Sequence, residues 1–64
     1  MEQKTIDALT ETRYSVHEAA GVLNMSDRWV RVQIQSGLLK AERYGRVWRV
    51  RASELRRFIE ESAR

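Results

Sequence analysis

Residues 14–37, YSVHEAAGVLNMSDRWVRVQIQSG, carry the strongest helix signals in the chain. Ser15 followed three residues later by Glu18 forms a capping box, which marks the start of a helix. The apolar residues that follow keep the spacing of one helix face: Val16, Ala19, Ala20 and Leu23. This pattern predicts a short helix from about residue 16 to residue 23.

A second helix is predicted directly after the first. Ser26 supplies an N-cap, and Asp27 places a negative charge at the positive end of the helix. Gly37 suits the left-handed residue that ends a helix, so we expect the helix to run from about residue 27 to residue 35. Two helices joined by about three residues have the proportions of a helix-turn-helix motif.

The stretch LLKAERYGRVWRVR, residues 38–51, predicts a β-hairpin because Gly45 separates two runs of β-prone residues. In the second run Trp48 and Val50 share one face, by the two-residue period of a strand. The other face carries Val47, Arg49 and Arg51. We therefore expect one face of the hairpin to pack against the protein and the arginine face to point outward.

The two ends of the chain give different signals. Residues 52–64 predict a closing helix with Ser53 as its cap, because apolar residues recur there with helical spacing at Leu55, Phe58 and Ile59. Residues 1–13 are mostly polar, and we expect a flexible lead-in or a short helix. The predicted fold is mainly α with a small β-hairpin, a winged helix-turn-helix domain over residues 14–64.

Length and composition exclude several classes of protein. A chain of 64 residues makes one small domain, which buries only about 60% of the surface of its unfolded chain. There is no cysteine, and His17 alone cannot assemble a zinc site, so we expect no metal and no cofactor. No apolar run is long enough to enter a membrane, and we expect a cytoplasmic protein.

The net charge of +3 is unevenly distributed. Residues 1–25 contain two basic and four acidic side chains, whereas residues 26–51 contain seven basic and two acidic ones. The positive field therefore belongs to the second helix and the hairpin, and an acidic partner is expected to meet that segment.

The second helix has an apolar face and a cationic face. At about 100° per residue Val30 and Ile34 point one way, while Arg28, Val32 and Gln35 point the other way with Arg31 beside them. Arginine and glutamine suit bidentate hydrogen bonds to base edges in the major groove, and valine suits a thymine methyl group. The predicted recognition-helix set is Ser26, Asp27, Arg28, Arg31, Val32 and Gln35. The alternative is an ordinary solvated helix face.

The hairpin carries the stronger functional signal. A narrow ribbon tipped by glycine and rich in arginine suits phosphates or the negative potential of a minor groove. The predicted wing set is Arg43, Tyr44, Gly45, Arg46 and Arg49. The alternative is a charged edge strand that prevents aggregation, but lysine serves that purpose well, and Glu42 is the only acid nearby in sequence to pair the arginines.

The remaining polar and aromatic residues have structural interpretations. Trp29 projects to the side of the second helix and is expected to be a partial core or interface residue, with a phosphate contact through its indole as the alternative. His17 and Glu18 are adjacent on a helix and do not face each other, so they form no catalytic pair. We therefore expect no enzymatic activity and no catalytic residues.

Residues 14–61 resemble the excisionase-type DNA-binding domains related to the MerR-type winged helix-turn-helix regulators, and are similar to small actinobacteriophage excisionases, the recombination directionality factors. The resemblance rests on an acid-alanine-alanine helix start, a serine-capped second helix with a buried valine, a serine-glycine exit, an arginine-rich wing with tryptophan and a Leu-x-x-Phe/Ile final helix. The positions are Glu18, Ala19, Ala20, Ser26, Val30, Ser36, Gly37, Gly45, Trp48 and Arg49. Arg31 and Gln33 depart from it, since many relatives have an aromatic residue and a leucine there.

The resemblance implies double-stranded DNA as the partner, with the second helix in the major groove and the wing in the neighbouring minor groove. It further implies binding at attachment-site direct repeats, self-association on DNA, contact with a tyrosine integrase and DNA bending that favours excision over integration. A small winged helix-turn-helix transcriptional regulator is the alternative within the same fold. A protein-interaction adaptor with a basic face is the alternative from a different class.

Overall fold

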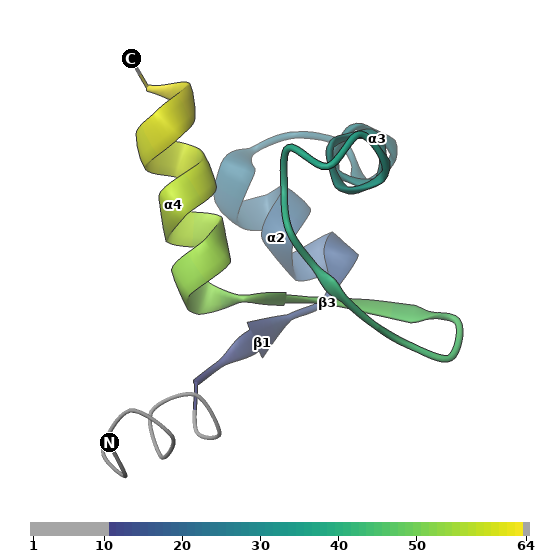
Figure 1. Ribbon diagram of the computed structural model, residues 1–64. Coiled ribbons are helices and arrows are strands. Elements are labelled where there is room, and N and C mark those ends of the chain that lie inside the picture. The colour runs from purple at the N-terminus through teal and green to yellow at the C-terminus, as the bar shows by residue number, and fades with distance from the viewer. Residues whose placement is uncertain (1–10, 64) are drawn as a thin grey trace, which may run out of the picture.

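The computed structural model describes residues 11–63 and contains three helices and three short strands within that range (Figure 1). The elements, in chain order, are β1 (Arg13–Tyr14), α2 (Val16–Leu23), α3 (Asp27–Gln35), β2 (Glu42–Tyr44), β3 (Val47–Arg51) and α4 (Ala52–Ser62). The predicted winged helix-turn-helix architecture is confirmed. A flexible lead-in or short helix was expected for residues 1–13. Residues 1–10 of this segment lie outside the described residues, and Arg13 belongs to strand β1.

The helix-turn-helix forms as its capping residues predict. The Ser15 hydroxyl accepts a hydrogen bond from the Glu18 amide, and the Glu18 carboxylate accepts one from the Ser15 amide, which completes the capping box. Asn24 ends α2 in the left-handed conformation with φ of 58°. Asparagine tolerates this conformation better than most side chains, and it lets the chain turn sharply into α3.

The strands form an antiparallel sheet in the order β1-β3-β2. The hairpin predicted at Gly45 is confirmed, with φ of 64° at that glycine, as type II′ turns require at the first turn position. The sequence did not predict β1, whose residues Arg13 and Tyr14 pair with Arg51 and Val50 of β3.

The hydrophobic core lies between the sheet and the helices. Val50 of β3 and Val30 of α3 are fully buried, and Leu39 in the segment that leads to the hairpin is 1% exposed. The other core residues come from all three helices and are Val16, Ala19, Ala20, Ile34, Leu55 and Phe58. Ala19 and Ala20 let α2 approach its neighbours closely, because their side chains occupy little space.

Two expectations for the closing helix were wrong. Ser53 is not the N-cap, because β3 continues directly into α4 and Arg51 occupies the cap position without a side-chain cap bond. Instead, the carboxylate of Glu11 accepts a hydrogen bond from the Ser53 amide in the first turn. Ile59, expected on the packed face, is 40% exposed, so Leu55 and Phe58 alone anchor this helix in the core.

Candidate nucleic-acid interface

Helix α3 is held by its apolar face and presents its polar face to solvent. Val30 and Ile34 are buried against the core. The opposite side chains are all exposed, as the helical period predicts: Arg28, Arg31, Val32 and Gln35. Arginine and glutamine are side chains that suit base edges in a major groove, and here they are exposed on a helix whose other face is buried in the core.

The first residues of α3 already have partners inside the protein. The Ser26 hydroxyl accepts a hydrogen bond from the Trp29 amide at 3.1 Å, which leaves its own hydroxyl hydrogen available to an external acceptor. The Asp27 carboxylate lies 3.1 Å from Nδ1 of His17, so this pair joins the starts of α2 and α3 at the surface. Sequence reasoning compared His17 only with its neighbour Glu18 and missed Asp27, because only the helix-turn-helix geometry brings the two together.

The three arginines predicted for the wing occupy three different environments. Arg46 is exposed in the turn at the tip of the hairpin. Arg43 lies on the same face as Trp48, its cross-strand partner, with the guanidinium carbon 5.2 Å from the ring centroid. Arg49 lies on the opposite face, is half-buried and donates a hydrogen bond to the Trp48 carbonyl at 3.1 Å.

Arg49 also approaches the start of α2. The hydrogen bond from the Ser15 amide is the main cause of the lowered pKa of Glu18, and the positive charge of Arg49 lowers that pKa further. Arg49 is therefore partly engaged by the protein, whereas Arg46 projects freely at the tip.

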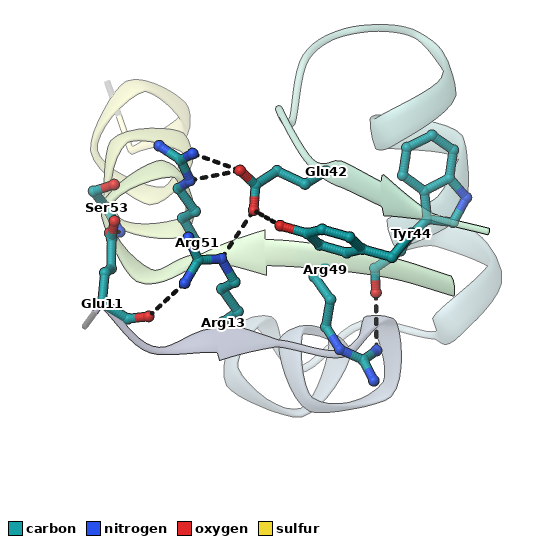
Figure 2. A network of polar contacts seen from close by, with 8 residues as sticks. Glu11, Arg13, Glu42, Tyr44, Arg49, Arg51 and Ser53 are labelled. Atoms are coloured by element: carbon teal, nitrogen blue, oxygen red, sulfur yellow. Dashed lines mark hydrogen bonds and ion pairs between the residues drawn. The ribbon is translucent and has the colours of Figure 1, made fainter. Parts of the chain in front are cut away.

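Glu42 organises a second group of arginines at the base of the hairpin (Figure 2). Its carboxylate accepts hydrogen bonds from Nε of Arg13 at 3.0 Å, from Nε of Arg51 at 3.0 Å and from the hydroxyl of Tyr44 at 2.9 Å. The hydrogen bonds from Arg51, and after them the one from Arg13, lower the pKa of Glu42 to about 2. Glu42 thus pairs with Arg13 and Arg51, and it makes no ion pair with the predicted wing arginines.

The two elements that carry the candidate residues lie on one side of the molecule. Figure 1 shows α3 and the hairpin on the same side, away from α4. Trp29 turns from α3 toward α4, where its ring meets Phe58 edge to face with centroids 6.0 Å apart. This confirms the interpretation of Trp29 as a partial core residue. The other predicted residues of α3 and the hairpin tip remain at the surface.

Residues 13–63 match the family model of a helix-turn-helix domain, and the chain belongs to this family. No significant match was found among curated proteins or among solved structures. Helix-turn-helix domains are typically DNA-binding and non-enzymatic, which fits the exposed cationic face of α3. Within residues 11–63, no helix is long and apolar enough to cross a membrane, and no group of three His, Asp or Glu side chains is placed to hold a metal ion.

Proposed function

We propose that this protein binds duplex DNA with α3 in the major groove and the tip of the β2–β3 hairpin at the neighbouring minor groove. The observation that carries the proposal is the division of the arginines into two groups. Arg13 and Arg51 are paired with Glu42, whereas Arg28, Arg31 and Arg46 make no ion pair within the described residues. Exposed, unpaired arginines on one side of a helix-turn-helix suit a polyanion.

The side chains have separate roles in this arrangement. Arg28, Arg31, Val32 and Gln35 read base edges, because they are the exposed side chains of α3. Ser26 donates its hydroxyl hydrogen to a phosphate while it caps the helix, and Asp27 holds the start of α3 against His17. At the wing, Gly45 forms the narrow tip and Arg46 enters the minor groove. Tyr44 supports the hairpin through Glu42, and Arg49 through the Trp48 carbonyl.

The biological role that we propose is control of recombination direction. The sequence of residues 14–61 resembles phage excisionases, which supports a DNA-associated factor that binds attachment-site direct repeats beside other copies of itself. By bending the DNA, the bound copies give a tyrosine integrase a geometry that favours excision. Site-specific recombination is then catalysed by the integrase, and this protein supplies no catalytic residue.

A reconstituted recombination reaction tests this role. A tyrosine integrase is combined with its attachment-site DNA, with and without this protein, and both directions of recombination are measured. We expect stimulation of excision and suppression of integration, and loss of both effects with Arg28→Ala. The matched control Arg56→Ala, an exposed arginine of α4, should behave as wild type. An unchanged ratio of excision to integration would contradict the recombination role, and repression of a nearby promoter would then favour the transcriptional regulator.

A further inference from the structure

The register of the hairpin places Arg43 on the inner face of the sheet. Arg43 is paired directly with Trp48, and Trp48 shares its face with Val50, which is fully buried in the core. Side chains of directly paired strand residues lie on the same face, so Arg43 projects toward the helices. Tyr44, one residue later, projects to the outer face, where its hydroxyl reaches Glu42.

Two contacts fix the guanidinium of Arg43. Its carbon lies 5.2 Å from the centroid of the Trp48 ring, and its Nε donates a hydrogen bond to the Gly45 carbonyl at 2.9 Å. Within the described residues its two terminal nitrogens have no hydrogen-bond acceptor. A planar guanidinium that is stacked on one face and bonded at Nε presents the fork of donors that matches a phosphate.

We infer that Arg43 and Trp48 form a binding site for a single phosphodiester on the inner face of the wing. The inference rests on the proposed function: one sugar-phosphate backbone separates a major groove from the adjacent minor groove. When α3 lies in the major groove and the hairpin tip lies in the minor groove, that backbone runs between them, past the inner face of the hairpin. Arg43 binds one phosphate of that backbone, and Trp48 is a positioning residue that holds Arg43 in place.

This assignment separates Arg43 from Arg46, although only two residues lie between them. Arg46 at the tip contacts the minor groove, so its contribution to DNA affinity depends on groove width and base composition. Arg43 contacts the backbone, so its contribution is independent of sequence and appears in the salt dependence of binding.

The test measures DNA affinity against salt concentration for Arg43→Gln, Trp48→Phe and Trp48→Leu. The probes are a duplex selected from a random-sequence library and a random-sequence duplex of equal length. We expect Arg43→Gln to reduce affinity for both probes by the same factor, roughly tenfold, and to reduce the log–log salt slope by about 0.9. The matched control Arg56→Gln, an exposed arginine on α4, should leave the slope unchanged.

The tryptophan variants test the positioning role. Trp48→Phe keeps a ring beneath the guanidinium and should retain most of the slope, whereas Trp48→Leu should lose as much slope as Arg43→Gln. The double variant, with Arg43→Gln and Trp48→Leu together, should have the same slope as Arg43→Gln alone. If Trp48 had only a structural role and did not act through Arg43, the second change would alter the slope further. If Trp48→Leu fails to fold, equal slopes for wild type and Trp48→Phe, together with a lower slope for Arg43→Gln, still support the site.

Selected probes with one methylphosphonate at each backbone position locate the phosphate. Wild type should be sensitive at a position that Arg43→Gln no longer distinguishes. An unchanged slope for Arg43→Gln, or a loss confined to A/T-rich probes, would overturn the phosphodiester site while leaving DNA binding intact. Failure of the wild-type protein to bind either probe would instead contradict the proposed function itself, and the site with it.

Discussion

Glu42 of β2 and Arg51 of β3 are joined by two hydrogen bonds across the base of the hairpin, from Nε and Nη2 of the arginine to one carboxylate oxygen. The other oxygen accepts from Nε of Arg13 in β1, so one carboxylate connects all three strands. Both arginines favour the ionised carboxylate and lower the pKa of Glu42 from 4.5 to about 2. This network holds the base of the hairpin against β1.

The lowered pKa of Glu42 predicts that the protein becomes more stable as pH rises from about 2 to 4.5. In this interval the unfolded chain binds more protons than the folded protein, so the free energy of unfolding increases with pH. The stabilisation is complete above pH 4.5 and is lost as pH falls toward 2. Glu11, held by Ser53, and Glu18, held by Ser15, have lowered pKa values and act in the same direction.

Thermal unfolding across this pH range checks the assignment to Glu42. Glu42→Gln should have a lower melting temperature than wild type at pH 6, and the difference should shrink as pH falls toward 2. Glu60→Gln removes an exposed carboxylate of α4 outside the network and serves as the matched control. If the melting temperatures of wild type and Glu42→Gln changed in parallel with pH, the role of this carboxylate would be contradicted.

Leu38 and Leu39 are adjacent but have opposite environments, which makes them a matched pair for stability. Leu39 is 1% exposed and Leu38 is 67% exposed. We expect Leu39→Ala to lower the free energy of unfolding by about 2–5 kcal/mol, because it leaves a cavity in the core. Leu38→Ala should change it by less than about 0.5 kcal/mol. Chemical denaturation measures both, and equal losses would contradict the described core.

The sequence predicted the elements whose signals are local. The capping box at Ser15 and Glu18 marked α2, and Gly45 marked the hairpin turn. Strand β1 was missed because two residues carry no detectable period and form a strand only by pairing with β3. Ser53 was misassigned as a cap because the direct passage from β3 into α4 moves the cap to Arg51.

The candidate site shows the same limit. The exposed face of α3 follows from helical angles, so Arg28 and Arg31 are placed as expected. The partners of the other arginines depend on contacts between distant segments, such as Arg13 with Glu42, 29 residues apart in sequence. Arg43, Arg46 and Arg49 were predicted as one wing set because they lie in the same hairpin, whereas strand pairing places Arg43 and Arg49 on opposite faces.

Arg28 and Arg46 should contribute to DNA binding in different ways. Arg28→Ala removes a directional contact from α3, and we expect it to relax preference at one base pair by about 1–3 kcal/mol. Arg46→Ala removes a minor-groove contact at the wing tip, so the loss of affinity should follow groove width and base composition and not the identity of one base pair. Affinities for a selected target, its single-base variants and random DNA measure the difference. Equal loss from both variants on all probes would show that α3 reads no sequence.

Tandem target sites should fill cooperatively. One recognition helix reads only a few base pairs, so adjacent copies gain affinity through the raised local concentration of their neighbours. The outer face of α4, with exposed Arg57, Glu60 and Glu61, is one surface available for such contacts. In gel-shift titrations, intermediate complexes should be sparse and the fully loaded DNA should be bent. Identical affinities for isolated and neighbouring sites would contradict cooperation.

Equilibrium binding to duplex DNA as a function of salt concentration tests the DNA-binding account most directly. Exposed arginines on α3 and the hairpin are expected to neutralise about four to six phosphates for each bound copy, which predicts a log–log slope of about −4 to −5. Duplex DNA should also displace any acidic protein bound to the same face. A slope near zero, or no retention on DNA at low salt, would contradict DNA binding and leave the protein-interaction adaptor as the better interpretation.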